Sequence, residues 1–353
     1  MLKVHVLFET HGGKPHGCSY IRLLNPLLTD TVKGEIELSY GVEIPSGPID
    51  VLVVERLWDQ VCSFGRDGER IKRLRKSGTK IVFEIDDNLL DVDFVYGAPS
   101  WPSIEQKMWL RRFVRLADCV VVSTPNLARR LEKLNSNIKV IENYLDGQLF
   151  AEAAMKPNRY YQDAKIVFGY MGTYTHLMDL LSIIQPLRSV LERYRDTVRF
   201  EILGIGDGPG NLILKRVFGD LPVKFLSVDA KDVDYPRFTK YMQSNMQWDF
   251  GIAPLLDNIF TRCKSDIKFL DYGVLGIPGI FSDVAAYSSS VLHGENGLLA
   301  TDSESWVSAL ELMITDSYAR DRLAANAHRH IWRERMVDKM ACKWLQCLRE
   351  VGS

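Results

Sequence analysis

Short apolar runs rich in β-branched residues alternate along the chain with longer segments whose apolar residues recur every three or four positions. The short runs predict buried strands and the longer segments predict amphipathic helices. Strands are expected at 3–8, 50–54, 80–85, 118–123, 138–141, 166–170, 199–203, 223–226, 250–254, 279–282 and 297–300. Helices are expected at 20–28, 67–76, 104–116, 125–134, 176–194, 237–245, 265–275, 303–315, 318–332 and 337–351. This alternation predicts the α/β class, with doubly wound parallel sheets covered by helices on both faces.

The alternation stops over residues 143–165, where tyrosines and a Lys-Pro-Asn turn replace the periodic pattern, and it restarts at residue 166. We therefore expect two Rossmann-like domains, one over 1–150 and one over 151–335, which face a central cleft. The last helix, 336–353, is expected to cross back to the first domain. Ligands bind such sheets at the carboxyl ends of the strands, so candidate functional residues are sought directly after each strand.

The composition disfavours several classes of protein: nucleic-acid binders, zinc or redox proteins and membrane-spanning proteins. The chain has 353 residues, 46% of them hydrophobic, and a formal net charge of -1. That balance disfavours a nucleic-acid partner held by a positive field over the whole molecule. The six cysteines form no CxxC pair, which disfavours a zinc or redox framework and suits a reducing, cytoplasmic setting. The sequence shows no signal peptide and no apolar run long enough to span a membrane, while attachment to a membrane surface stays open.

Two glycine-containing turns follow predicted first strands. Gly12 and Gly13 follow the first strand of the first half, where backbone N–H groups can approach a ligand oxygen, although a plain turn explains them equally well. Gly172, Thr173 and His176 follow the first strand of the second half and precede a predicted long helix. A helix start suits a phosphate group, and an ordinary capped helix is the alternative.

A dense polar stretch leaves the predicted strand at 250–254 and enters the next helix. Lys264 and Ser265 are expected at the start of that helix, where an anion is favoured. Asp271 lies further along, and its carboxylate can accept hydrogen bonds from the two hydroxyls of a ribose. Alternatively, Lys268 and Asp271 pair with each other on the helix surface.

Acidic residues follow the predicted strand at 80–85. Asp86 and Asp87 are candidates to contact or deprotonate an acceptor hydroxyl, and a solvated acidic loop is the alternative. Asp91 and Asp93 also match the short DxD pattern of metal-dependent sugar transferases that have a single-domain fold.

These residues resemble a known family. The run 264–272, the Gly-Ile-Pro turn at 276–278, Ser282-Asp283, Tyr287 and the segment 294–299 resemble the donor helix and following loop of retaining GT-B-fold glycosyltransferases of family four. Residues 172–176 with Asp179 are similar to a subgroup turn, and so in the first half are 84–87, 123–125 and 142–143. The resemblance covers nearly the whole chain, and its second half is the more specific part.

The resemblance implies transfer of a sugar, of hexosyl type and with retention, from a nucleoside diphosphate sugar to an acceptor hydroxyl. The donor base (UDP, GDP or dTDP) is left open, and no cofactor or metal is expected. The acceptor would be a glycan or a lipid-linked glycan, as in polysaccharide or glycolipid synthesis. The departing phosphate can itself take the acceptor proton in such enzymes.

Two departures from the family pattern concern the expected site. The family's two glutamates, separated by seven residues, fall at Cys263 and Asp271. A thiol cannot accept strong hydrogen bonds from a sugar, so Asp266 is expected to bind the sugar in place of Cys263. The arginine and lysine that usually clamp the diphosphate are replaced near Thr173 and Met178. Lys264, His176 and the N–H groups at the helix start would then neutralise the phosphates.

Two alternative activities remain open on the sequence. One is a nucleotide-sugar-binding scaffold without turnover, which Cys263 favours, and the other is a sugar-nucleotide epimerase of the same fold. Two basic segments, 66–76 and 107–115, indicate either solvated helix faces or a peripheral contact with the inner face of a membrane.

Overall fold

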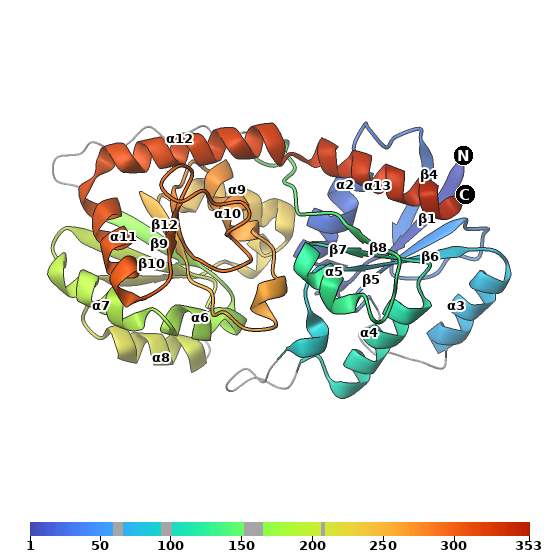
Figure 1. Cartoon of the computed structure of the whole chain (residues 1–353), viewed down its shortest axis with the longest axis horizontal. Coiled ribbons are helices and arrows are strands. Elements are labelled where there is room, and N and C mark those ends of the chain that lie inside the picture. The colour runs from blue at the N-terminus through green and yellow to red at the C-terminus, as the bar shows by residue number, and fades with distance from the viewer. Residues whose placement is uncertain (59–65, 93–100, 152–164, 206–208) are drawn as a thin grey trace. The chain divides into compact units, whose positions relative to one another are not determined.

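The computed structural model describes residues 1–58, 66–92, 101–151, 165–205 and 209–353 (Figure 1). The chain divides into two compact units. Unit 1 comprises Met1–Asp146, Cys263–Ser265 and Met336–Ser353, and unit 2 comprises Gly147–Arg262 and Asp266–Arg335. The expected division between 150 and 151 falls close to Asp146, and the last helix belongs to unit 1. Three residues from the middle of the expected second domain also belong to unit 1.

Unit 1 is built on a six-stranded parallel sheet whose strand order is β4-β1-β5-β6-β7-β8. Its strands are β1 (Leu2–Leu7), β4 (Ile36–Gly41), β5 (Val51–Glu55), β6 (Lys80–Ile85), β7 (Cys119–Val122) and β8 (Ile138–Val140). A short hairpin, β2 (Thr10–His11) and β3 (Lys14–Pro15), follows β1. The helical segments are α1 (Gly17–Ser19), the π-helical turn η1 (Tyr20–Leu24), α2 (Asn25–Leu27), α3 (Arg66–Lys76), η2 (Leu89–Asp91), α4 (Ile104–Leu116), α5 (Pro125–Leu131) and α13 (Val337–Gly352).

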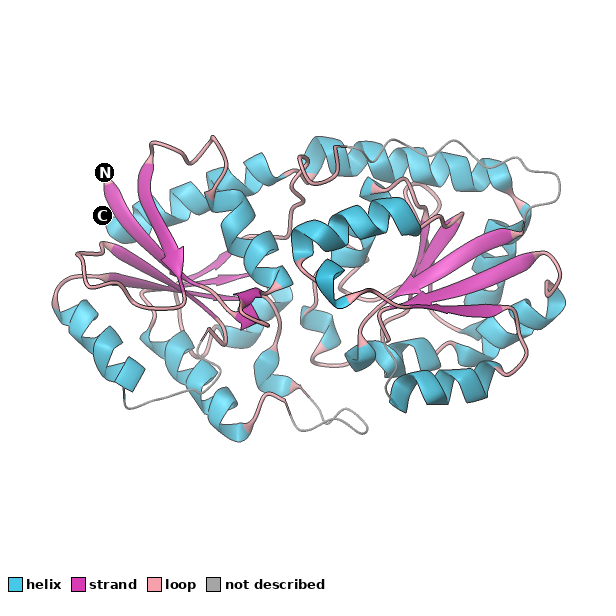
Figure 2. Cartoon of the chain, turned by 180° about the vertical axis from the view of Figure 1, so that it is seen from behind, coloured by secondary structure: helices cyan, strands magenta, loops and turns pink. Residues whose placement is uncertain are grey.

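Successive residues of the unit 1 strands enter two different cores, as the period of two in a strand requires. Val51 and Val53 of β5 face the core that α13 covers through Trp344. Leu52 and Val54 face the opposite core, which Trp109 of α4 fills. Figure 2 shows helices on both faces of this sheet. Both faces are therefore buried, which explains why the strands read as continuous apolar runs.

Unit 2 repeats the architecture with the strand order β11-β10-β9-β12-β13-β14, the doubly wound order 3-2-1-4-5-6. Its strands are β9 (Ile166–Met171), β10 (Val198–Leu203), β11 (Val223–Leu226), β12 (Phe250–Ala253), β13 (Gly279–Ser282) and β14 (Leu298–Ala300). Its helical segments are η3 (Tyr174–His176), α6 (Leu177–Leu181), α7 (Ile184–Arg193), α8 (Pro209–Phe218), η4 (Ala230–Asp232), α9 (Tyr235–Asn245), η5 (Thr261–Cys263), α10 (Ile267–Val274), α11 (Ser303–Thr315) and α12 (Ser317–Glu334).

Aromatic rings from neighbouring strands form the centre of the unit 2 core. Phe168 of β9 stacks on Phe200 of β10 and on Phe250 of β12, with 4.8 Å between the ring centroids in each pair. On the other sheet face, Trp248 lies so close to Gly169 that a Cβ at that position would come within 2.0 Å of the indole. The sheet centre is therefore tightly packed on both faces.

The structure departs from the expected elements in four places. The helix expected over 176–194 is broken into η3, α6 and α7, so the turn after β9 leads into a helix of only five residues, α6. Strand β4 and helix α8 are present where the pattern predicted neither. Helix α10 begins at Ile267, two residues later than expected. Among the described residues, no helix is long and apolar enough to cross a membrane.

Candidate functional site

Each sheet has one place where the direction of strand addition reverses, and in such sheets ligands bind outside the carboxyl ends of the strands at that place. In unit 1 it lies between β1 and β5, and in unit 2 it lies between β9 and β12. Glu9 and Arg56 follow these strands in unit 1, and Gly172, Thr173 and His176 follow them in unit 2.

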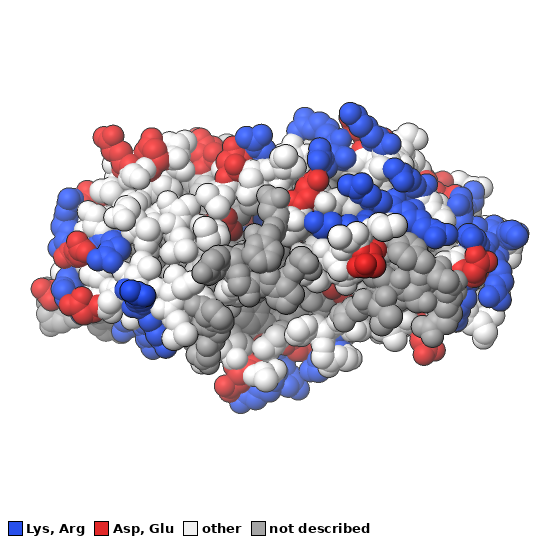
Figure 3. Space-filling view, turned by 90° about the horizontal axis from the view of Figure 1, so that it is seen from below, with Lys and Arg blue, Asp and Glu red and all other residues white. Residues whose placement is uncertain are grey.

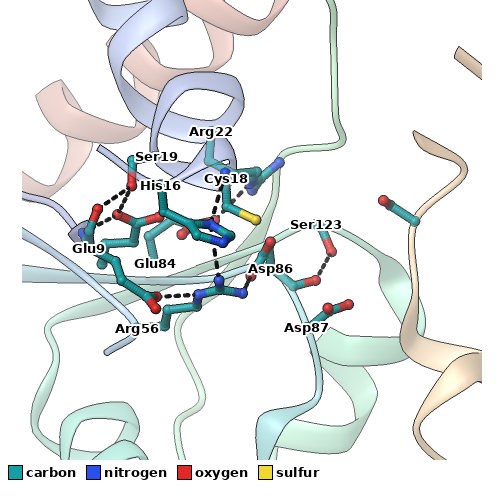
Figure 4. A network of polar contacts seen from close by, with 12 residues as sticks. Glu9, His16, Cys18, Ser19, Arg22, Arg56, Glu84, Asp86, Asp87 and Ser123 are labelled. Atoms are coloured by element: carbon teal, nitrogen blue, oxygen red, sulfur yellow. Dashed lines mark hydrogen bonds and ion pairs between the residues drawn. The ribbon is translucent and has the colours of Figure 1, made fainter. Parts of the chain in front are cut away.

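Arg56 occupies the switch point of unit 1 (Figure 4). It follows β5, and its Nε donates to Glu9 Oε2, beyond β1, at 2.7 Å. Its Nη1 donates to Asp86 Oδ1, beyond β6, at 2.7 Å. Burial opposes ionisation of Asp86, but the Arg56 charge lowers the pKa of this carboxyl to about 2. One buried arginine therefore joins the ends of three strands and holds Asp86 as a carboxylate.

Figure 4 shows a second buried arginine, Arg22, in the same group of polar side chains. Arg22, on η1, donates through Nε to Glu84 Oε1 at 2.7 Å and through Nη1 to the Ile141 carbonyl at 2.6 Å. The same Nη1 donates to Asn143 Oδ1 at 2.9 Å. Arg22 is almost fully buried. Solvent therefore screens its attraction to Glu84 only weakly.

Two glutamates end neighbouring strands of this cluster. Glu55 and Glu84 are register partners on β5 and β6. Burial raises the pKa of Glu84 to about 7 despite Arg22, and burial together with the charge of Glu84 raises the pKa of Glu55 well above its usual range. Glu55 Oε2 accepts from the Glu9 backbone N–H and from Ser19 Oγ, each at 2.6 Å. This pair of carboxyls therefore tends to retain a proton at neutral pH.

The three-residue segment Cys263–Ser265, which we call the strap, is held by unit 1 through side chains at its strand ends. Thr124 Oγ1 donates to the Cys263 carbonyl at 2.9 Å, and Asn143 Nδ2 donates to Ser265 Oγ at 2.8 Å. Lys264 Nζ lies 3.2 Å from Asp87 Oδ2. Lys264 and Ser265, which were expected at the start of α10, thus lie before it and contact unit 1.

The Cys263 side chain belongs to the apolar core of unit 1 that α4 and α5 cover. Burial raises the pKa of its thiol to about 11. Cysteine suits this environment as a small apolar group, whereas a glutamate would place a carboxyl there. The departure from the family pattern at this position therefore has a packing explanation.

Gly12 and Gly13 form the tip of the β2–β3 hairpin. Their φ angles are 59° and 77°, which only glycine adopts readily at two successive positions, as a tight hairpin requires. Both residues are exposed, and no other atom lies within 4 Å of where a Cβ would be. The hairpin geometry alone explains both glycines, and ligand binding by Gly13 stays a prediction.

In unit 2, Asp179 ties together the ends of the two strands at the switch point. Its Oδ2 lies 2.7 Å from His176 Nδ1, and its Oδ1 accepts from the Leu256 backbone N–H at 2.9 Å. His176 follows β9 and Leu256 follows β12. The buried carboxylate therefore orients the imidazole and fixes it against the loop of the neighbouring strand.

Gly172 and Thr173 lie directly after β9. A Cβ on Gly172 would come within 2.5 Å of the Tyr170 hydroxyl, so close packing requires glycine there. Thr173 Oγ1 lies 2.9 Å from Thr175 Oγ1, and Thr173 is the N-cap of η3. The structure thus brings Gly172, Thr173 and His176 together in one strand-end turn.

Asp271 lies on α10 with its side chain buried and its Oδ1 without a hydrogen-bond partner. Burial raises the pKa of this carboxyl to about 7, and the nearby Lys268 charge opposes that rise. The Lys268 ammonium lies 5.3 Å from the centre of the Tyr170 ring. The described residues provide no ion pair for Asp271, so the carboxyl has unused hydrogen-bonding capacity.

Asp266, the expected replacement for the missing glutamate, is the N-cap of α10. Arg335 donates from Nη1 and Nη2 to its two carboxylate oxygens at 2.6 and 2.9 Å, and Ser290 Oγ donates at 2.5 Å. These contacts anchor the start of α10 to the end of α12, and a role in catalysis stays a prediction.

The described residues contain no group of three or more His, Cys, Asp or Glu side chains suited to a metal ion. Asp91, from the DxD pattern, accepts from Arg130 Nε at 2.6 Å and from Asn88 Nδ2 at 2.9 Å. These hydrogen bonds lower the pKa of Asp91. Asp93, the other member of that pattern, lies outside the described residues.

The sequence interpretation missed the two buried arginines, Arg22 and Arg56, and their partner Glu9. A usable signal was present for Arg56, because a charged residue directly after the apolar run 51–54 must lie at a strand end. Arg22 carried no such signal, since its partners are 62 and 121 residues away in the chain.

No protein-family model and no curated protein matches the sequence. Solved structures do match. Anabaena HepE, solved in complex with UDP-glucose, covers 99% of this chain and 100% of its own, at 16% identity and a TM-score of 0.66. A glycosyltransferase from Rickettsia africae gives 11% identity, 99% and 97% coverage and a TM-score of 0.64. Sucrose-phosphate synthase from Thermosynechococcus elongatus gives 16% identity, 86% and 73% coverage and a TM-score of 0.59.

These neighbours are GT-B glycosyltransferases, and the similarity to HepE extends over nearly the whole chain. The chain therefore has the GT-B fold, which confirms the predicted pair of doubly wound α/β domains.

Proposed function

We propose that this chain is a glycosyltransferase that moves a sugar from a nucleoside diphosphate sugar to an acceptor hydroxyl. The donor would bind at the strand ends of unit 2 and the acceptor at the strand ends of unit 1. The fold supports this division of labour, because each sheet presents its polar residues at its own switch point. HepE was solved with UDP, UDP-glucose and glucose, so UDP is the first nucleotide to test.

The observation that carries the proposal is the buried Asp271 carboxyl with its unpartnered Oδ1. A buried polar atom without a partner costs free energy, which a ligand hydroxyl would recover. The two hydroxyls of a ribose match the two oxygens of a carboxylate. Asp271 on α10 is therefore the group we assign to the donor's ribose.

The donor's diphosphate develops negative charge as the bond to the sugar breaks. Fixed N–H groups and cations near that charge stabilise the transition state. His176, held by Asp179, and the backbone of Gly172 and Thr173 would provide these contacts beside β9. Lys264 is a further candidate, although in this structure it pairs with Asp87.

On the acceptor side, Asp86 suits binding better than proton abstraction. A carboxylate whose pKa lies near 2 is a weak base, because Arg56 stabilises its charged form. It remains a good hydrogen-bond acceptor for a sugar hydroxyl. We therefore assign Asp86 and Asp87 to orientation of the acceptor and leave the acceptor proton to the departing phosphate.

The finer features follow from the sequence resemblance. We propose hexosyl transfer with retention of configuration, without a metal cofactor, to a glycan or lipid-linked glycan. Asp266 would act by holding the start of α10 through Arg335, rather than by touching the sugar.

Nucleotide binding tests the donor site directly. Thermal unfolding is measured with UDP, GDP, dTDP, CDP and ADP, each with and without Mg²⁺. A nucleotide present at 100 times its dissociation constant stabilises the native state by about 2.7 kcal/mol, so one diphosphate is expected to raise Tm without Mg²⁺. Asp271→Ala is expected to abolish that rise. Asp220→Ala removes an exposed aspartate of unit 2 and is the matched control.

The binding test has two contrary outcomes. A rise that requires Mg²⁺ would contradict metal independence, and no rise with any nucleotide would contradict the donor site. A nucleotide-sugar-binding scaffold is the second candidate, favoured by the burial of Cys263 where the family has a glutamate. Binding of the matching nucleotide sugar without release of nucleoside diphosphate in the presence of glycan acceptors would support the scaffold.

A further inference from the structure

Helices α3 and α4 concentrate positive charge on one part of unit 1. Together they contain ten lysines and arginines but only three aspartates and glutamates, a net charge of +7. Since the whole chain carries -1, the remaining residues carry -8. Figure 3 shows basic side chains gathered over this part of unit 1. Positive charge is therefore concentrated on α3 and α4, while the rest of the chain is acidic.

The two helices form a groove of about 600 Å³ lined by Arg75, Met108, Arg111, Arg112, Arg115 and Leu116. We call this surface the α3–α4 basic groove. Four guanidinium groups share it with two apolar side chains. Like charges gathered in one concave surface repel each other, so an anionic partner would relieve that repulsion.

Two of the four arginines that line the groove, Arg111 and Arg115, have no acidic partner among the described residues. Arg75 reaches Asp118 at 3.3 Å, and this pair is partly exposed to solvent. For Arg111 and Arg115, the described part of the chain offers no hydrogen bond or ion pair, although the charge of Arg111 acts on Asp91 through space. Exposed arginines without acidic partners keep their charge available for binding.

The exposed stripe of α4 is apolar at one end and basic at the other. Ile104, Met108, Arg111 and Arg115 follow each other at spacings of four, three and four, which places them along one face of the helix. Ile104 is 75% exposed and Met108 is 59% exposed. The opposite face, with Trp109 and Phe113, is buried in the core. The exposure of two large apolar side chains on a folded helix therefore serves no packing within the described structure.

We propose that the α3–α4 basic groove and this stripe bind the surface of an anionic phospholipid bilayer. The arginines would contact lipid phosphates, and Ile104 with Met108 would enter the boundary between head groups and acyl chains. A bilayer presents both chemistries at one surface, whereas a soluble phosphate or a nucleic acid leaves the aliphatic side chains in water. Membrane binding is independent of the proposed glycosyl transfer, because it uses no residue of the strand-end sites.

Vesicle sedimentation with the full chain tests the proposal. Vesicles are made from phosphatidylcholine alone or with phosphatidylglycerol, and binding is expected only to the anionic ones. Each basic residue near such a surface contributes about 1 kcal/mol, so Arg111→Ala/Arg115→Ala should weaken partitioning about 30-fold. Arg329→Ala/Arg333→Ala removes two exposed arginines with the same spacing from α12 and should leave binding unchanged.

The apolar half of the stripe has its own variant. Ile104→Ser/Met108→Ser should weaken binding at both low and high salt, whereas the loss caused by the arginine variant should shrink at high salt. Thermal unfolding and UDP binding of each variant check that the fold and the donor site are intact. The Tm and the UDP affinity of each variant are expected to match those of the unmodified chain. Failure of the membrane proposal is therefore distinguishable from failure of the transferase proposal.

Four results would overturn the inference. Equal binding to neutral and anionic vesicles would remove the charge argument, and unchanged binding of the arginine variant would remove the groove. Displacement of the chain from vesicles by a short RNA that binds the same arginines more tightly would assign the groove to nucleic acid. Equally tight binding of inorganic diphosphate, with no vesicle binding, would assign it to a soluble anion.

Discussion

The strand-end cluster of unit 1 and the Asp271 region of unit 2 differ in how their buried carboxyls are paired. In unit 1, Arg56 and Arg22 pair with Glu9, Asp86 and Glu84, so each buried carboxylate of that set has a guanidinium partner. In unit 2, Asp271 is buried with no ion pair among the described residues, and its pKa rises to about 7. Unit 1 therefore balances Glu9 and Asp86 with Arg56 and gives Glu84 a guanidinium partner, although Glu55 Oε1 and Glu84 Oε2 accept no hydrogen bond within the described part of the chain. In unit 2, the described residues give Asp271 no such partner.

The difference separates carboxyls that a buried arginine holds from a buried carboxyl that has no ion pair among the described residues. A buried ion-pair network is costly to break, because removal of one partner leaves an uncompensated charge. An unpartnered buried carboxyl weakens the protein until something binds it. The following predictions test this contrast, from the largest expected effect to the smallest.

Removal of Arg56 should damage unit 1 most. Arg56→Met leaves Glu9 and Asp86 without their shared partner, and we expect the free energy of unfolding to fall by about 3–5 kcal/mol. Urea denaturation measures the loss. Arg130→Met, which removes the exposed partner of Asp91, is the control and should cost less than about 1 kcal/mol. A loss of the same small size for Arg56→Met would show that the cluster is not balanced by this arginine.

Asp271 should make the stability of the protein depend on pH. The pKa of Asp271 is about 7 in the folded state and lower in the unfolded state. The contribution of this carboxyl to the free energy of unfolding is therefore fully present below about pH 4 and is lost as pH rises through 7. Between pH 5 and pH 8 the loss should approach about 3 kcal/mol. In urea denaturation, the free energy of unfolding of Asp271→Asn should therefore fall by about 3 kcal/mol less between pH 5 and pH 8 than that of the unmodified chain. Identical declines in the two proteins would mean that the folded pKa is not raised.

Asp179 should act through His176. Asp179→Asn weakens a charge-assisted hydrogen bond to the imidazole, and we expect kcat/KM for the donor to fall about 10–100-fold. His176→Ala combined with Asp179→Asn should be no worse than His176→Ala alone, since both changes remove one unit. Additive losses would show that the two residues act independently.

Lys264 should show the smallest effect on stability. Lys264→Met removes a partly exposed pair with Asp87, which is worth less than about 1 kcal/mol. If Lys264 serves the donor's diphosphate, the dissociation constant for UDP rises for this variant and not for Asp87→Asn. Calorimetric titration compares the two. Equal weakening by both variants would place the pair in one structural role within unit 1.

The pattern of apolar residues predicted most of the architecture. Strand β6 and helices α4 and α11 have the expected bounds, because their apolar residues follow one period from end to end. The prediction of one helix over 176–194 was wrong. Apolar residues of α6 and α7 enter the same core, but the helix is interrupted between Leu181 and Ile184. Strand β4, at the edge of its sheet, was missed because its mixed burial leaves no alternating pattern.

The candidate site was predicted less completely. Strand-end position singled out Asp86, Asp87 and His176, and the helix after the strand at 250–254 singled out Asp271, and the roles of all four stay predictions. It did not reveal that Asp266 pairs with Arg335, 69 residues away. Long-range pairs of this kind leave no trace in local spacing, because the two partners meet only when their helices pack.

The sequence by itself determined the two α/β units, their doubly wound class and the strand ends at which chemistry is possible, because periodicity and chain order are local properties. Only the tertiary structure decided which charges meet. It placed Arg56 between Glu9 and Asp86, moved Cys263–Ser265 into unit 1 and left Asp271 buried without an ion pair among the described residues. Pairing and desolvation depend on distances between segments far apart in the chain, and folding alone sets those distances.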